Sequence, residues 1–181
     1  KHTLRYDHDR KGNEQTESVA EHVYALHILC DYFLPLQTDS VIDPVKVRNI
    51  LTWHDMGEGL VGDMTSRTKT DDHKQAEKEA EAKFVEDAPE HLRGIIANCF
   101  DEYNAQETIE SQFARALDKL EPLFHLIFLS HQPGFMVFDL GWTTEQYKTY
   151  RRPSVEKFPL LQRFDDVLSQ ELDTVGYFPL S

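Results

Sequence analysis

Apolar residues recur at intervals of three and four positions along most of the chain, and no segment alternates clearly between apolar and polar residues. The first pattern is typical of helices with one buried face, whereas alternation would indicate half-buried strands. Val19, Val23, Leu26, Cys30 and Phe33 mark such a face near the start of the chain. The periodicity therefore predicts a protein built from helices.

Local start signals divide this sequence into separate helices. Ser18 is followed three residues later by Glu21, which is the pattern of a capping box, and 143–146 repeats it. Asp43 before Pro44 is a second kind of helix start. We predict helices over about 19–34, from 44 to the glycines at 57–62, over 73–88, 89–103 and 108–129, and from 143 and 159.

These elements predict an all-α fold with a single helical bundle of six or seven helices. We expect 1–130 to form the core of the bundle and 131–181 to form a C-terminal helical extension packed on it.

Composition excludes some classes of partner. Asp and Glu number 32 against 19 Lys and Arg, so the formal net charge is −13. Proteins that bind nucleic-acid polymers or anionic membranes draw affinity from Lys and Arg, so we expect this chain to bind neither. Apolar residues make up 40% of the chain, which is enough for a packed core, so the charge does not indicate disorder.

The two cysteines, Cys30 and Cys99, are isolated and lie in apolar helical contexts. This usage fits buried free thiols in a reducing compartment, and we expect a cytoplasmic protein. No apolar run reaches the ~18–20 residues of a transmembrane helix. The chain begins at Lys1 and not at Met, so we expect further residues upstream of it.

Polar residues interrupt the apolar faces of three predicted helices. The inward face of the second helix continues into His54 and, four residues later, Glu58, with Asp55 beside it. His22 lies on the apolar face of the first helix, and Asp118 lies on that of the fifth. Because a buried charge is costly unless it is paired or bound to a metal, these positions need an explanation.

Two imidazoles and two carboxylates from three helices would form a mixed nitrogen and oxygen metal site. Such a site suits Mn, Fe, Co, Ni or Zn better than Ca or Cu(I). Glu58 would then lie where a general acid or base is needed. Two other interpretations stay open on the pattern alone. Each inward histidine can be an ordinary core residue, and Asp118 can be an exposed partner of Lys119 or Arg115.

Four motifs follow one another along the chain: Gln-Thr-Glu-Ser-Val-Ala-Glu-His at 15–22, His-Asp-Met-Gly-Glu at 54–58, Val-Gly-Asp at 61–63 and Leu-Asp-Lys-Leu at 117–120. In order and spacing they resemble the HD-domain metal-dependent phosphohydrolases, over about two thirds of the chain. The Glu after the His-Asp pair and the following Gly-Asp resemble the branch of 5′-deoxynucleotidases. Enzymes of this branch remove the phosphate from deoxynucleoside 5′-monophosphates.

The resemblance implies a role for each matching position. It implies one bound divalent metal ion, which can be Mn, Co, Fe, Zn or Mg. The family's catalytic carboxylate falls on Glu58. Its metal ligands fall on His22, His54, Asp55 and Asp118.

The resemblance also implies contacts to the substrate. The family's phosphate-binding arginine falls on Arg5, and the aspartate that helps hold the sugar falls on Asp63. Tyr6 stands where the family often has a tryptophan that helps to select deoxyribose, so the preference between deoxyribose and ribose stays open. In the loop that follows, we interpret Arg67 and Lys69 as solvated charges and not as phosphate contacts.

The implied activity is removal of phosphate from (deoxy)nucleoside 5′-monophosphates by attack of a metal-bound water. The resemblance also implies a small nucleotide as the substrate and a homodimer as the assembly. Two alternatives stay open: hydrolysis of another phosphate ester, such as a cyclic or pyrophosphorylated nucleotide, and a non-catalytic metal-binding or ligand-sensing helical module. The chain has neither a P-loop motif nor a dinucleotide-binding glycine motif.

Overall fold

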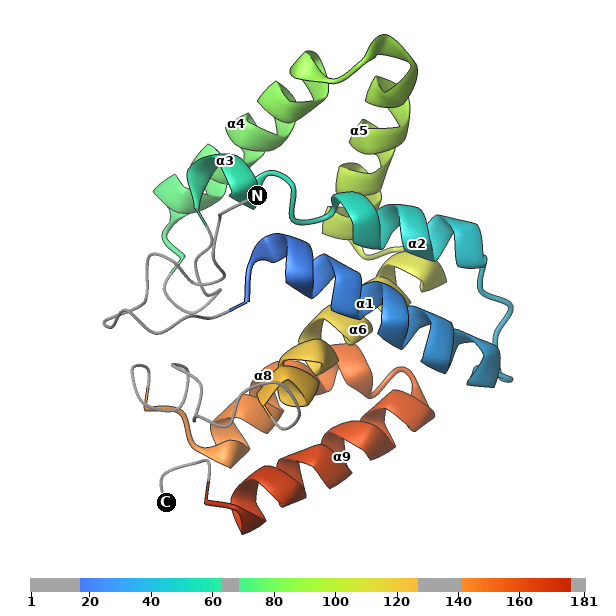
Figure 1. Cartoon of the computed structure of the whole chain (residues 1–181), viewed down its shortest axis with the longest axis vertical. Coiled ribbons are helices and arrows are strands. Elements are labelled where there is room, and N and C mark those ends of the chain that lie inside the picture. Colours follow the sequence, from blue (N-terminus) through green and yellow to red (C-terminus); the bar gives the residue numbers. More distant parts are fainter. Residues whose placement is uncertain (1–16, 63–68, 127–140, 177–181) are drawn as a thin grey trace.

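A computed structural model describes residues 17–62, 69–126 and 141–176, and within these residues every regular element is helical (Figure 1). The prediction of an all-α fold is confirmed, with seven described helices of ten residues or more and the single-turn helix α3. No described helix has the length and apolar character needed to cross a membrane. The elements are α1 (Val19–Phe33), the 3-10 helix η1 (Leu34–Leu36), α2 (Pro44–Trp53), α3 (Glu58–Val61), α4 (Asp71–Asp87), α5 (Glu90–Ala105), α6 (Ile109–Phe124), α8 (Thr144–Val155) and α9 (Pro159–Thr174).

The helices begin at the residues that the capping patterns indicate. The Ser18 side chain accepts from the backbone N–H of Glu21, and the Glu21 carboxylate accepts from the backbone N–H of Ser18. The Asp43 side chain accepts from two backbone N–H groups of α2, and Thr143 and Gln146 form a second capping box at α8. These bonds satisfy N–H groups that have no partner within the helix. The two predicted capping boxes and the Asp-Pro start are therefore confirmed.

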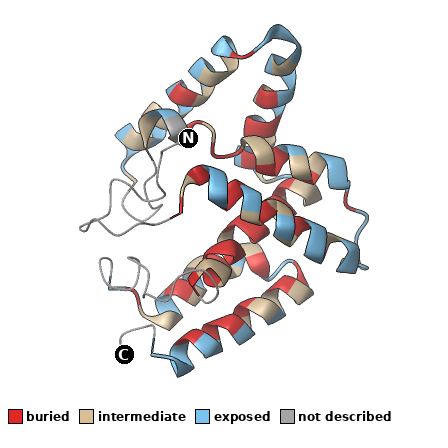
Figure 2. Ribbon diagram, in the orientation of Figure 1, coloured by how far each residue is buried: buried red, intermediate tan, exposed pale blue. Residues whose placement is uncertain are grey.

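Helix α6 lies at the centre of the molecule and packs against α1, α2, α5, α8 and α9. Figure 1 shows the α4–α5 pair at one end of the bundle and the α8–α9 pair at the other. In Figure 2 the buried residues gather on the helix faces that are turned toward this centre. The predicted boundary at residue 130 falls outside the described residues, so the division into a core and an extension stays a prediction.

One predicted helix ends earlier than expected. Helix α2 ends at Trp53, and a turn over 54–57 separates it from α3, so the prediction that Glu58 continues the face of α2 is wrong. Gly57 in this turn lies against α4, where an added Cβ would come within 2.9 Å of the Glu81 side chain. Helix α6 runs to Phe124 with Pro122 inside it, 125 and 126 continue as a π-helical turn, and the predicted helix end near 129 lies outside the described residues.

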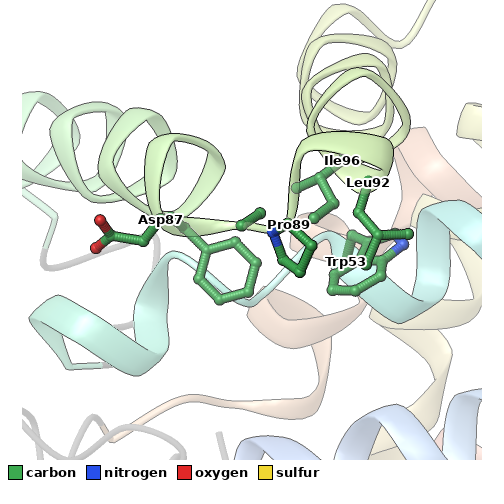
Figure 3. A pocket seen from close by; sticks show the side chains of 7 residues that line it. Trp53, Asp87, Pro89, Leu92 and Ile96 are labelled. Carbon is green, nitrogen blue, oxygen red and sulfur yellow. The ribbon is translucent and has the colours of Figure 1, made fainter.

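A small apolar cluster, distinct from the main core, joins α4 and α5 to the end of α2. It is built from Ala88, Ile96 and Phe100, with Trp53 and Phe84 packed against it. A pocket of about 300 Å³ opens beside it between α2, α4 and α5 (Figure 3). The pocket is lined by Trp53, Phe84, Asp87, Ala88, Pro89, Leu92 and Ile96. With one carboxylate among seven lining residues, it offers packing surface and no convergent polar groups.

Candidate metal centre

Three helices bring together the four side chains that the sequence selected. His22 lies in the first turn of α1, His54 and Asp55 directly follow α2, and Asp118 lies on the central helix α6. All four are buried, and each offers one ligand atom such that these atoms lie within 4.8 Å of one another. A divalent ion bound by nitrogen and oxygen ligands needs such a convergent arrangement.

The orientation of His54 is fixed by the end of its own helix. Its Nδ1 lies 3.0 Å from the carbonyl oxygen of Leu51, which can only accept, so Nδ1 carries the proton and donates. In the neutral imidazole, Nε2 then presents a lone pair to the cluster. This buried Nε2 makes no hydrogen bond, although Asp55 Oδ1 lies only 3.1 Å away. Two acceptor atoms at that distance repel each other unless a cation is shared between them, so the pair fits a metal ion.

Asp118 has one oxygen for the cluster and one for its support. Oδ1 lies 3.2 Å from His22 Nε2. Oδ2 accepts a hydrogen bond from the Tyr103 hydroxyl at 2.9 Å and forms an ion pair with Lys119 Nζ, also at 2.9 Å. Burial alone would raise the pKa of Asp118, but the adjacent Lys119 ammonium lowers it, and this pKa lies well below its usual value. Asp118 therefore enters the cluster as a carboxylate.

The alternative of an exposed Asp118 is wrong, because the residue is 5% exposed. It does contact Lys119, as that alternative supposed, but from inside the molecule. Tyr103 is also buried, and its pKa is raised well above the usual value by burial and by the charge of Asp118, so it stays a hydrogen-bond donor. The Arg115 guanidinium lies over the Tyr103 ring, 4.3 Å from its centroid.

His22 is held between carboxylates at both ring nitrogens. Nε2 lies 3.2 Å from Asp118 Oδ1 and 3.7 Å from Asp55 Oδ2, and Nδ1 lies 2.8 Å from Glu121 Oε2. The sequence places Glu121 on the same face of α6 as Asp118, three residues later, but gives no reason to assign it a role. Both supporting groups, Glu121 and Tyr103, were missed because their contacts depend on how separate helices pack.

Glu58 lies at the start of α3, where a lysine holds its carboxylate. Lys69 Nζ lies 3.3 Å from Glu58 Oε1 and 2.7 Å from Glu77 Oε1 on α4. Burial lowers the pKa of Lys69, but the two carboxylates outweigh it and leave this pKa raised. The Lys69 side chain is only 17% exposed, so its interpretation as a solvated loop charge is wrong.

The predicted substrate contacts Arg5, Tyr6 and Asp63 lie outside the described residues, as does Arg67. Their roles stay predictions. The two cysteines are described, and both are buried free thiols, as the sequence predicted.

Comparison with known proteins identifies the family of this chain. A family model for the HD domain matches residues 1–151. The chain belongs to the HD-domain family. A crystal structure of a protein described as a predicted metal-dependent phosphohydrolase from Magnetospirillum magnetotacticum MS-1 has the same fold as this HD-domain chain, with a TM-score of 0.74. It is 24% identical and covers 92% of this chain and 85% of its own.

Curated relatives of this HD-domain chain carry the name 5′-deoxynucleotidase. The human protein 5′-deoxynucleotidase HDDC2 is 29% identical over 127 residues, which are 67% of this chain and 60% of the human protein. The Schizosaccharomyces pombe protein 5′-deoxynucleotidase hdd1 is 32% identical over 117 residues, or 61% and 57% of the two chains. The match thus spans about 60% of the length of these relatives.

Proposed function

We propose that this HD-domain protein is a metal-dependent phosphohydrolase that removes phosphate from (deoxy)nucleoside 5′-monophosphates. The observation that carries the proposal is the buried cluster in which His54 Nε2 lies 3.1 Å from Asp55 Oδ1 without a hydrogen bond. Relatives named 5′-deoxynucleotidase, at about 30% identity, support the choice of substrate class.

The donor set fits a divalent transition metal. The ion would be held by His22 and His54 through Nε2 and by Asp55 and Asp118 through a carboxylate oxygen each. Two imidazoles and two carboxylates suit Mn, Fe, Co or Zn, and they give a net charge that a dication neutralises. When bound, such an ion supplies Lewis acidity: it lowers the pKa of a coordinated water and offsets negative charge on a phosphoryl group.

The other residues act on the proton and on the substrate. We propose that Glu58 accepts the proton of the attacking water, and that its pairing with Lys69 keeps its carboxylate at the start of α3. Arg5 would bind the phosphate through its planar, permanently charged guanidinium, and Asp63 would bind the sugar hydroxyls. No nucleophilic serine or cysteine is required, which agrees with the burial of both thiols.

A nucleotide phosphatase panel with elemental analysis tests the proposal. Purified protein should contain one divalent ion per chain. After chelation, adding back Mn, Co, Zn or Mg should restore phosphate release from deoxynucleoside 5′-monophosphates. Release only from cyclic or pyrophosphorylated nucleotides would move the protein to another class of phosphohydrolase. A metal-loaded protein that releases no phosphate from any nucleotide would overturn an enzymatic function.

A further inference from the structure

A fifth buried side chain, that of Glu121, contacts His22 at the ring nitrogen that points away from the metal cluster. We infer that Glu121 is a positioning residue: it holds the proton of His22 on Nδ1 and thereby presents His22 Nε2 to the metal. The inference rests on the proposed metal site and adds to it a residue that binds neither metal nor substrate. Glu121 Oε2 lies 2.8 Å from His22 Nδ1, and the Glu121 residue is 1% exposed. That distance is the length of a hydrogen bond, in which Nδ1 donates to the Glu121 oxygen when Nδ1 carries the proton.

A second carboxylate lies near the same nitrogen but cannot replace Glu121. Glu17 Oε1 is 3.7 Å from His22 Nδ1, beyond hydrogen-bond length, and Glu17 Oε2 lies 3.4 Å from His125 Nδ1. Glu17 and Glu121 therefore place similar charge beside one imidazole, but only Glu121 makes the bond. This difference provides a matched control within the protein.

The two metal-facing histidines are oriented by different means. For His54 the acceptor of the Nδ1 proton is the Leu51 carbonyl, three residues back in the chain, so the end of α2 fixes this ring locally. For His22 the acceptor is Glu121, 99 residues away in sequence. A histidine that binds a metal through one nitrogen needs its other N–H held, and loss of such a partner weakens metal binding. The ring of His22 thus depends on α6 packing against α1.

The spacing of Asp118 and Glu121 on α6 explains how one helix contacts both nitrogens of the His22 ring. Asp118 and Glu121 are three residues apart, so both project from the same face of α6. Asp118 Oδ1 contacts Nε2 of His22 and Glu121 Oε2 contacts Nδ1, so the imidazole lies between two adjacent turns of α6.

The competing interpretation is a second metal ion at His22 Nδ1, held by Glu17, His22 and Glu121. It excludes ours, because Nδ1 cannot hold a proton and a metal ion at the same time.

Zinc affinity in matched variants tests the inference. We would measure the zinc dissociation constant by competition with a chelator for the wild type, Glu121→Ala, Glu121→Gln and Glu17→Gln. Glu121→Ala should weaken binding by about 10- to 100-fold. Glu121→Gln, whose amide oxygen can still accept, should weaken it less, and Glu17→Gln should leave it unchanged. Equal losses in the two Gln variants would overturn the inference, because they would show a general effect of charge.

A spectroscopic readout separates positioning from a merely structural role. In the zinc-loaded, ¹⁵N-histidine-labelled wild type, the His22 Nδ1–H should give a proton signal protected from exchange, and Glu121→Ala should lose that protection while remaining folded. Glu121→Met fills a similar space without a strong acceptor, so it serves if the Ala variant fails to fold. An unprotonated Nδ1 with two zinc ions per chain would overturn the inference in favour of a second metal.

Failure of the inference and failure of the proposed function give different results. A wild type that binds no divalent ion would overturn the proposed function, and the inference with it. A wild type that binds one ion with the same affinity as Glu121→Ala would overturn the inference alone.

Discussion

Two buried polar clusters among the described residues differ in how their charges are balanced. One is the metal-site cluster of His22, His54, Asp55 and Asp118 between α1, α2 and α6. The other joins α8 to α9: Arg151 donates to Asp165 Oδ1 at 2.6 Å and to Ser169 Oγ at 2.8 Å. The Arg151 guanidinium also stacks on Tyr147, 3.9 Å from the ring centroid.

The second cluster contains its own cation, whereas the first lacks one at its centre. Arg151 Nε lies 2.6 Å from Asp165 Oδ1, so the two opposite charges are paired within the fold, although Arg151 Nη1 and Asp165 Oδ2 have no hydrogen-bond partner among the described residues. In the metal-site cluster the nearest fixed cation, Lys119, contacts only the outer oxygen of Asp118, and the inner atoms of His54 and Asp55 are left facing each other. We conclude that a buried ion pair formed by the protein's own residues needs no ligand, while a buried cluster that needs an added cation indicates a binding site.

The largest expected effect comes from Asp118→Asn. The amide keeps the size of the side chain and its acceptor for Tyr103, but it removes a charge that faces the metal. We expect loss of the bound ion in elemental analysis and a fall of phosphate release to the level of chelated wild type. Retention of one ion per chain in this variant would contradict the assignment of Asp118 as a ligand.

Glu58→Gln should separate catalysis from metal binding. The variant should keep one ion per chain, because Glu58 is not among the four clustered ligands. Its turnover should fall by about 10²- to 10⁴-fold, the usual contribution of a general base. Elemental analysis and kcat on the same preparation provide the check. Full turnover would exclude Glu58 as the proton acceptor.

Arg151→Met tests the structural cluster. It leaves Asp165 buried without its cation, which typically costs about 3–5 kcal/mol of unfolding free energy. Denaturant unfolding should show this loss, while the folded fraction keeps its ion and its turnover. Replacing both residues, as Arg151→Met with Asp165→Leu, should recover most of the stability, because no charge is then left uncompensated. A loss of metal in either variant would contradict the separation of the two clusters.

The smallest effect concerns two residues outside both clusters. Burial raises the pKa of the Cys30 and Cys99 thiols to about 11. Because thiolates react and thiols do not, alkylation of the folded protein near pH 8.5 should be much slower than that of the unfolded protein. The raised pKa also favours the folded state at low pH, and this contribution is lost as pH rises from about 9 toward 11. Rapid alkylation of the folded protein at pH 8.5 would contradict the burial of these thiols.

The sequence predicts those features that depend on local chemistry. Capping residues located the starts of α1, α2 and α8, because a cap and the N–H groups it satisfies lie within four residues. The polar interruptions of apolar faces located His22, His54 and Asp118, because the face of a helix follows from its period. The motif resemblance then assigned them their roles.

The remaining features depend on contacts between distant segments. The turn after Trp53 moves Glu58 off the face of α2. In this turn Gly57 lies against α4, and hydrophobic periodicity cannot reveal such a tertiary contact. The pairing of Lys69 with Glu58 and Glu77 has the same origin. The bond from His22 to Glu121 spans 99 positions, and no local pattern indicates it.

The central claim is that the buried cluster between α1, α2 and α6 holds one divalent ion. Anomalous diffraction from zinc-loaded crystals tests it most directly. We expect a single strong peak at about 2.0–2.2 Å from His22 Nε2, His54 Nε2 and an oxygen of each aspartate. We also expect that Glu121 Oε2 remains on His22 Nδ1, on the side away from the peak. Zinc bound at Nδ1, or no peak inside the cluster, would contradict the account.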